Sequence, residues 1–141
     1  MATDVSHRSV RLERVEAGRF AATNDRGGRV VFSTGSGEDF TPVDLFLAAI
    51  GGCTAVDVDA VTSRRAEPDS FEIVVDAEKA RDDGGNHLVN IEVTYRITFP
   101  AGADGDKARA ILPEIVRQSH ERLCTVSRTV ELGTPIATRI E

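Results

Sequence analysis

Two cysteines carry the most distinctive chemistry in this chain. Cys53 and Cys124 are its only thiols. A free cysteine is most often a small apolar residue of the core, so one interpretation is a pair of inert core residues. The other interpretation is that folding brings the two sulfurs together as a reactive pair. The second possibility predicts a thiol-redox enzyme.

Other catalytic patterns are weak in this sequence. His7, His87 and His120 lie far apart, and no spacing of cysteines, histidines or carboxylates matches a metal site. No serine lies in a nucleophile elbow, and the glycine-rich segment STGSGED lacks the lysine of a phosphate-binding loop. His120 precedes Cys124 by one helical turn, but we interpret it as a surface histidine of an amphipathic helix rather than as a catalytic base.

Length, composition and charge limit the class of protein. The chain has 141 residues, 40% of them hydrophobic, which predicts a single domain over 1–141. A formal net charge of -6 without a block of lysine or arginine argues against nucleic acid as a partner. We see neither a signal peptide nor an apolar stretch approaching the roughly 20 residues that cross a bilayer. We therefore expect no membrane partner and a cytoplasmic protein, where a cysteine pair is more plausibly catalytic or redox-sensing than structural.

The first half of the chain predicts strands followed by a long helix. Alternating residues predict strands over 9–20 and Arg29–Ser33, separated by a turn-rich segment. Thr41, a following proline and Asp44 then form a helix start close to a capping box. The helix is expected to continue to about residue 65. These elements must position the first cysteine.

The helix that carries Cys53 has apolar residues around most of its circumference. This pattern predicts a central helix that is buried on several sides. Gly51 and Gly52 cost roughly 1 kcal/mol each inside a helix relative to alanine, which suggests that a backbone or a ligand comes close there. Close helix packing is the alternative explanation.

The second half of the chain predicts a hairpin and another helix. Residues 71–77 and 89–99 alternate between apolar and polar, and a glycine-containing connection joins them. A helix is predicted over 106–123, with a kink or restart at Pro113. The tail over 134–140 is expected to add a short strand.

The order of these elements and two local strings resemble the OsmC/Ohr superfamily of osmotically induced and organic-hydroperoxide-resistance proteins. The strings are TPVDLFLAAIGGCTAVDV around Cys53 and ERLCTVSRTVE around Cys124. The resemblance covers essentially the whole chain. It implies an α+β fold built as an intertwined homodimer, with long buried helices enclosed by antiparallel sheets and active sites formed between the subunits.

The resemblance also implies a function, the reduction of organic hydroperoxides in oxidative-stress defence. Cys53 would be the peroxidatic cysteine and Cys124 the resolving cysteine, and an external dithiol would reduce the resulting disulfide. No cofactor is implied. The family supplies an arginine near the thiolate, and Arg19 is the candidate, with Arg26 and Arg29 as rivals.

One position departs from the family pattern. Val43 stands where the peroxidases have the glutamate that holds this arginine, and Asp44 next to it is better explained as a helix cap. We therefore expect a less firmly held arginine, a weaker peroxidase and a gain of turnover from Val43→Glu. Asp57, one turn after Cys53, is expected either to orient a cation or to raise the pKa of the thiol.

Two other functions remain open at this point. The first is a non-enzymatic binding module of the same fold for an apolar ligand, which the valine at position 43 favours. The second is an acyl thioesterase of the hot-dog type, because that fold also wraps a sheet around a long helix. The absence of a suitable carboxylate disfavours the thioesterase. A peroxidase that prefers organic over inorganic peroxides fits the apolar surroundings of Cys53 best.

Overall fold

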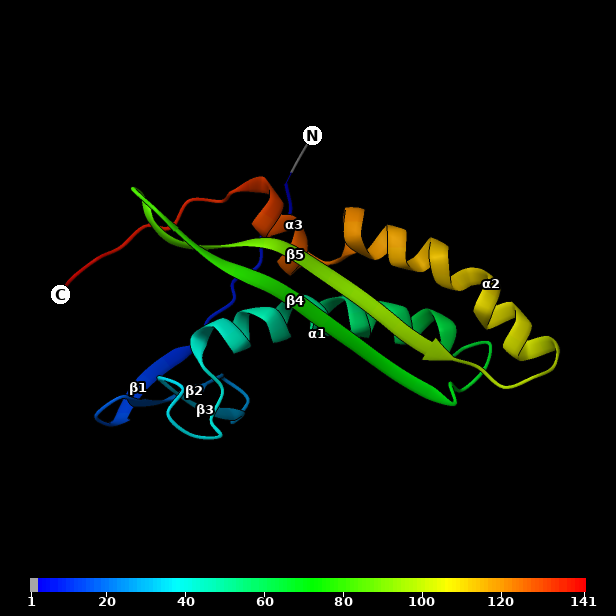
Figure 1. Ribbon diagram of the computed structural model, residues 1–141, viewed down its shortest axis with the longest axis horizontal. Coiled ribbons are helices and arrows are strands. Elements are labelled where there is room, and N and C mark those ends of the chain that lie inside the picture. The colour runs from blue at the N-terminus through cyan, green and yellow to red at the C-terminus, as the bar shows by residue number, and fades with distance from the viewer. Residues whose placement is uncertain (1–2) are drawn as a thin grey trace. The chain divides into compact units, whose positions relative to one another are not determined.

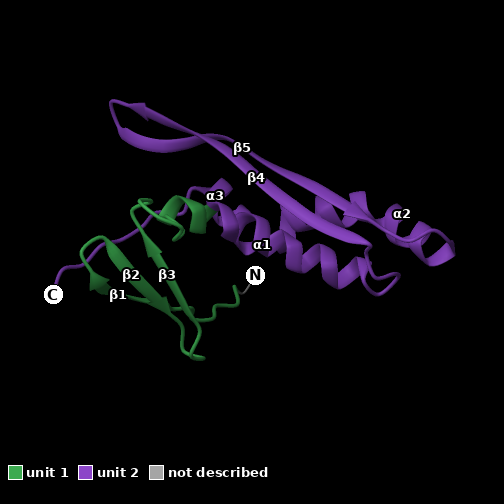
Figure 2. Ribbon diagram, turned by 60° about the horizontal axis from the view of Figure 1, so that its bottom comes forward, with its two compact units in different colours: residues 1–46 green, residues 47–141 purple. Residues whose placement is uncertain are grey.

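The computed structural model describes residues 3–141 and has an α+β fold, as predicted (Figure 1). The chain separates into two compact units, one up to Phe46 and one from Leu47 to Glu141 (Figure 2). The first unit contains an antiparallel sheet of three strands. The second contains a two-stranded antiparallel sheet together with most of the helical residues.

The sheet of the first unit consists of β1 (Arg11–Glu16), β2 (Arg19–Thr23) and β3 (Arg29–Ser33), paired in that order. The single strand predicted over 9–20 is wrong, because the chain turns between β1 and β2. Gly18 has a φ of 74° in this turn, a left-handed conformation that favours glycine. The strand predicted at Arg29–Ser33 is confirmed.

Aromatic stacking and a turn stabilise this small sheet. Phe20 and Phe32 are direct cross-strand neighbours, and their rings stack with centroids 5.6 Å apart. The side chain of Asn24 closes the turn between β2 and β3 by accepting from the backbone N–H groups of Arg26 at 3.0 Å and Gly28 at 2.8 Å. The turn chemistry that the sequence predicts is therefore present.

The long helix α1 spans Pro42–Thr62, close to the predicted range. Its start is a reciprocal capping box. Thr41 Oγ1 accepts from the backbone N–H of Asp44 at 3.1 Å, and Asp44 Oδ2 accepts from the backbone N–H of Thr41 at 2.9 Å. This arrangement confirms the capping role predicted for Asp44.

The prediction that α1 is buried on several sides is wrong for the chain by itself. Its buried residues follow essentially one face, at four-residue spacing. They are Ile50, Gly51, Thr54, Val58 and Thr62. Val56 points away from this face and is 71% exposed. Apolar residues therefore surround α1 in the sequence pattern, but a single chain buries only one face of this helix.

The expectation that no apolar stretch is long enough to cross a bilayer is also wrong on length and composition. Within the described residues, α1 is the one helix that is long and apolar enough to cross a bilayer, with a mean hydropathy of 1.6 over its most apolar window. Only 28% of that window is buried inside the structure. The core helices of soluble proteins meet the same criterion, so the finding is weak evidence for a membrane span.

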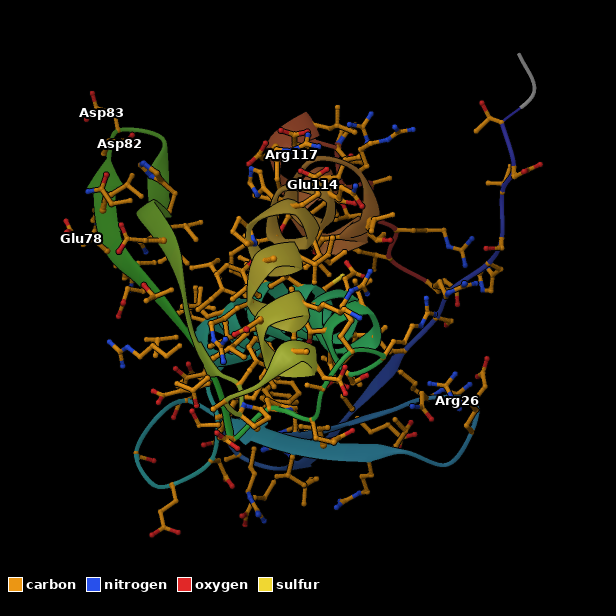
Figure 3. The ribbon with its side chains drawn as sticks, turned by 90° about the vertical axis from the view of Figure 1, so that its right-hand side faces the viewer. Arg26, Glu78, Asp82, Asp83, Glu114 and Arg117 are labelled. Atoms are coloured by element: carbon orange, nitrogen blue, oxygen red, sulfur yellow. The ribbon has the colours of Figure 1, made fainter. Side chains whose placement is uncertain are left out.

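The second unit is built on a long hairpin. Strand β4 (Ser70–Asp82) pairs antiparallel with β5 (Gly85–Thr98), which confirms the two predicted strands and extends both. The register shifts between Asp76 and Glu78, and this irregularity bends the ladder. Figure 3 shows Asp82 and Asp83 at the tip of the hairpin.

Helix α2 (Ala103–Gln118) follows the hairpin and continues through Pro113. Both α1 and α2 run along the same side of the β4–β5 hairpin (Figures 1 and 3). On the surface of α2, Glu114 and Arg117 form an ion pair, and both residues are labelled in Figure 3. The predicted helix over 106–123 is thus confirmed, with its last turn, Ser119–Leu123, in a π-helical form.

The end of the predicted second helix is where sequence and structure differ most. A single π-helical turn at Ser119–Leu123 ends the α-helical region, and a separate helix α3 (Thr125–Leu132) follows Cys124. The short strand predicted over 134–140 is wrong, because this segment has no regular secondary structure. Wider π turns of this kind occur frequently at functional sites.

Candidate functional site

Folding brings the two thiols together within the second unit. Cys53 lies in the middle of α1, whereas Cys124 lies between the π turn and α3. Both cysteines are free, Cys124 is fully buried, and Cys53 is partly exposed. Each thiol affects the pKa of the other through a hydrogen bond between their side chains. The two thiols therefore belong to one site.

Cys124 occupies the N-cap position of α3, where a side chain can accept hydrogen bonds from free backbone N–H groups. Its Sγ accepts from the backbone N–H of Ser127 at 3.4 Å and lies 3.3 Å from Ser127 Oγ. The backbone N–H of Cys124 in turn donates to the carbonyl of Ser119 at 2.8 Å. The π turn and the start of α3 thus fix the sulfur between them.

The pKa of Cys124 is lowered from its ordinary value. Burial alone raises it, but hydrogen bonds from the side chain and backbone of Ser127 outweigh burial, with smaller contributions from Cys53 and from the backbone of Val126. A helix N-terminus also favours negative charge. The environment of Cys124 therefore stabilises a thiolate.

The pKa of Cys53 is shifted in the opposite direction. Burial raises it most, and the hydrogen bond and negative charge of Cys124 raise it further. The backbone N–H groups of Val126 and Thr125 lower it, but less. Cys124 is thus the more acidic of the two thiols, and each influences the titration of the other.

A cavity of about 460 Å³ lies near this site: Ser127, which contacts Cys124, forms part of its wall, whereas neither cysteine lines it. Residues from α1, β5, the end of α2, the π turn and α3 line the cavity. Its lining is made up of Ile50, Thr54, Ile91, Glu92, Val93, Tyr95, Val116, His120, Ser127, Val130 and Glu131. The wall thus combines five apolar side chains with six that carry a polar group, a mixture that small-molecule sites also have.

A chain of hydroxyl groups leads from the cavity wall into the protein. Tyr95 Oη lies 2.7 Å from Thr54 Oγ1, which lies 2.9 Å from Ser119 Oγ. Ser119 Oγ donates to Asp57 Oδ2 at 2.8 Å. Among the described residues Asp57 is therefore paired with a hydroxyl, and it is not among the groups that shift the pKa of Cys53. Its partner is a buried hydroxyl.

The two glycines before Cys53 have different surroundings. A Cβ atom on Gly51 would lie 2.8 Å from Cγ2 of Val75, so α1 and β4 approach each other closely at this residue. A Cβ atom on Gly52 would meet nothing within 4 Å. Close packing therefore explains Gly51, whereas Gly52 borders open space.

Arg19 lies on β2 in the first unit, where its Nε donates to Asp39 Oδ2 at 3.0 Å. Glu16 lies 4.0 Å from the same guanidinium group. Arg19 therefore has acidic partners within this unit although position 43 is valine, whereas the expectation that it is held less firmly beside Cys53 stays a prediction. Val43 is 43% exposed at the start of α1. The rivals Arg26 and Arg29 are exposed.

His120 is exposed, as expected for a surface histidine, but it also lines the cavity. Its Nε2 lies 3.1 Å from Glu131 Oε1, a contact between the π turn and α3. In the part of the chain that the structure describes, no three histidine, cysteine or acidic residues are placed to hold a metal ion. The described polar groups at this site are therefore thiols, hydroxyls, the imidazole of His120 and the carboxylates of Asp57, Glu92 and Glu131.

Sequence reasoning found both cysteines but missed the polar residues around them. Ser127 lies three positions after Cys124, a spacing that could have indicated an N-cap interaction. Tyr95, Thr54 and Ser119 lie on three different elements, and no local pattern connects them. Only the packing of α1 against β5 and the π turn brings them together.

Comparison with known proteins supports one family. The model of the OsmC-like protein family matches residues 35–139. An uncharacterized protein of Mycobacterium tuberculosis is 26% identical over 126 residues, covering 89% of this chain and 90% of the relative. The protein YhfA of Escherichia coli is 26% identical over 128 residues, covering 89% and 91%. These relatives match nearly the full length of the chain.

Solved structures with similar folds show lower identity. An OsmC-like protein of unknown function from Vibrio cholerae has a TM-score of 0.71 at 15% identity, covering 90% of this chain and 95% of that protein. An organic hydroperoxide resistance protein from Legionella pneumophila has a TM-score of 0.59 at 15% identity, covering 91% of each chain. At such identities the similarity extends to the fold.

Proposed function

Since this chain belongs to the family of OsmC-like proteins, we propose that it reduces organic hydroperoxides with the thiols of Cys53 and Cys124. The membership confirms the predicted superfamily, some of whose structures are those of organic hydroperoxide resistance proteins. The observation that carries the proposal is that the two thiols lie close enough at the start of α3 to shift each other's pKa, with the pKa of Cys124 lowered. Two inert core cysteines need no such arrangement.

In the proposed first step, Cys53 attacks the hydroperoxide, because its sulfur is the more accessible of the two. The thiolate of Cys124 takes the proton of Cys53, so that the attacking sulfur becomes nucleophilic at the moment of reaction. The new bond joins Cys53 sulfur to the terminal peroxide oxygen, and the O–O bond breaks. The leaving alkoxide takes the proton from Cys124 and departs as an alcohol.

In the proposed second step, the thiolate of Cys124 attacks the sulfenic acid on Cys53. The S–O bond breaks, a disulfide forms, and the departing hydroxide takes a proton from solvent to become water. An external dithiol then reduces the disulfide by thiol–disulfide exchange. In this scheme Cys124 is first the base that activates Cys53 and then the resolving thiol.

The cavity beside the pair supports a preference for organic over inorganic peroxides. Its apolar wall includes Ile50, Val93 and Val130, which can contact the hydrocarbon part of a substrate. Hydrogen peroxide has no such part and gains nothing from these contacts. The preference should therefore appear mainly in KM.

We further propose that the protein works as a homodimer in the reducing cytoplasm. The support is the exposed apolar surface of α1, where Val56 is 71% and Val43 is 43% exposed. Apolar surface of this kind on a central helix is commonly covered by a second copy. Light scattering at micromolar concentration should give the mass of two chains, and a stable monomer would contradict this part of the proposal.

The activity is tested by following consumption of cumene hydroperoxide and of hydrogen peroxide with a dithiol as the reductant. We expect turnover with the organic peroxide, a higher KM for hydrogen peroxide, and no turnover for Cys53→Ser. Cys124→Ser should accumulate sulfenic or over-oxidised Cys53, because the resolving thiol is absent. If wild-type thiols remain intact in excess cumene hydroperoxide, the peroxidase is refuted and the apolar binding module is favoured.

A further inference from the structure

The charged groups in the wall of the cavity are mainly acidic. They are Glu92 on β5, Glu131 on α3 and His120 in the π turn, and all three residues are exposed to solvent. An exposed carboxyl group is ionised near pH 7. Two carboxylates and one imidazole give a negative sum whether or not the imidazole carries a proton. The cavity therefore presents negative charge to a ligand.

His120 does not neutralise this wall. Its Nε2 lies 3.1 Å from Glu131 Oε1, so a positive charge on the imidazole is balanced by the carboxylate that it already contacts. The charge of Glu92 then remains. Among the described residues that line the cavity, none is a lysine or an arginine.

The arginines next to the wall in the sequence lie outside it. Three of them adjoin lining residues without lining the cavity themselves: Arg96, Arg117 and Arg128. Arg96 forms an ion pair with Glu72, and Arg117 forms one with Glu114. These two guanidinium groups are thus engaged by other carboxylates.

A bulge in β5 lies directly before Glu92. Asn90 and Ile91 together oppose the single residue Ala77 of β4, and Asn90 has a φ of 53°, a left-handed conformation that asparagine tolerates. Bulges increase the local twist of a strand and re-aim side chains. The consecutive residues Ile91, Glu92 and Val93 all line the cavity, although alternate residues of a regular strand face opposite sides.

We propose that Glu92 and Glu131 are specificity-determining residues, whose charges repel a carboxylate and so make the cavity select uncharged or cationic organic molecules. In the reaction proposed above, the substrate is then an uncharged organic hydroperoxide, such as that of a lipid ester, rather than the hydroperoxide of a free fatty acid. This identification of the substrate rests on the proposed function, whereas the selection by charge does not.

The thiol pair contributes charge of the same sign. The pKa of the phenol of Tyr95, which lines the cavity, is raised most by burial and further by the negative charge of Cys124, although the hydrogen bond with Thr54 lowers it. The charge of Cys124 therefore acts at the cavity wall. Apolar neighbours such as Ile50 reduce the screening of these charges by water.

The test compares octylamine with octanoate, which have the same length of carbon chain and opposite charges near pH 7. Binding to the reduced full-length protein is followed by tyrosine fluorescence, because Tyr95 is the only tyrosine and the chain has no tryptophan. Both ligands lose the hydration of a charged group, so their ratio reports the sign of the field. At low salt we expect the amine to bind about tenfold more tightly. The ratio should fall at 1 M salt, where the Debye length is about 3 Å.

Matched variants separate the cavity from the net charge of -6 on the whole chain. Glu92→Gln and Glu131→Gln should each lower the ratio roughly threefold, and the double variant should bring it close to one. Glu121→Gln is the control, because it removes the same charge at a residue that pairs with Arg117 and does not line the cavity. A ratio that survives in the double variant, an equal fall in the control, or no binding of either ligand would each overturn the inference.

Binding and chemistry can fail separately in this design. The second measurement compares the loss of thiols with the hydroperoxide of linoleic acid and with that of its methyl ester, and we expect the ester to react faster. Charge-selective binding with thiols that survive both hydroperoxides would retain the selection and refute the peroxidase. Rapid oxidation without charge-selective binding would do the reverse. Equal rates despite charge-selective binding would refute the assignment of the substrate.

Discussion

Removing the thiol of Cys53 should raise the pKa of Cys124. The Cys53 S–H group donates to the Cys124 sulfur and is one of the groups that lower its pKa. A hydrogen bond to a charged group is worth about 1.5–3 kcal/mol, and a thiol is a weak donor, so the lower value applies. At 1.36 kcal/mol per pKa unit, Cys53→Ala should shift the pKa of Cys124 upward by about one unit.

The assay is titration of the thiolate absorbance in the ultraviolet, since each single-cysteine variant has only one thiol to ionise. Cys53→Ser is the matched control, because its hydroxyl can still donate and should preserve most of the lowered pKa. The reciprocal variant Cys124→Ala should lower the pKa of Cys53, because it removes a neighbouring negative charge and leaves the N–H groups at the start of α3. A fall in the Cys124 pKa on Cys53→Ala would refute the conclusion that the Cys53 thiol lowers the pKa of Cys124.

Three further predictions concern the surroundings of the site. Gly51→Ala should lower the free energy of unfolding by about 1–3 kcal/mol, because its Cβ would lie 2.8 Å from a side chain of β4. Gly52→Ala should raise the free energy of unfolding by up to about 1 kcal/mol, because its Cβ would meet no atom within 4 Å. Chemical denaturation measures both changes. Thr41→Ala should lower it by about 1 kcal/mol in the same assay, because the capping box is lost. Val43→Glu should leave peroxidase turnover unchanged because Asp39 already bonds the arginine, and a clear increase would support the original sequence-based expectation.

Local patterns predicted the elements that depend on neighbouring residues. The capping box at Thr41, the turn at Asn24 and the alternation along β5 each arise within a few residues, so the sequence was sufficient to place them. The resemblance to a family identified both cysteines. Their contact is a long-range property, and the sequence offered it only as one of two interpretations.

Other features depend on packing between distant segments, and sequence reasoning missed them. The helical periodicity after Pro113 continued past Gln118, but the chain forms a π turn there and begins α3 at Thr125, which places Cys124 at a helix N-terminus. The partner of Arg19 was sought at position 43, whereas Asp39 in the preceding loop supplies the carboxylate. Neither the start of α3 nor the partner of Arg19 follows from periodicity, because each depends on how a loop folds back.

The central claim is that Cys53 and Cys124 form one redox pair. Its most direct test is to treat the reduced protein with one equivalent of cumene hydroperoxide and to identify the products by peptide mass spectrometry. The account predicts an intramolecular disulfide between Cys53 and Cys124, with loss of both free thiols and release of cumyl alcohol. Two intact thiols, or oxidation that stops at one cysteine while the other remains free, would contradict it.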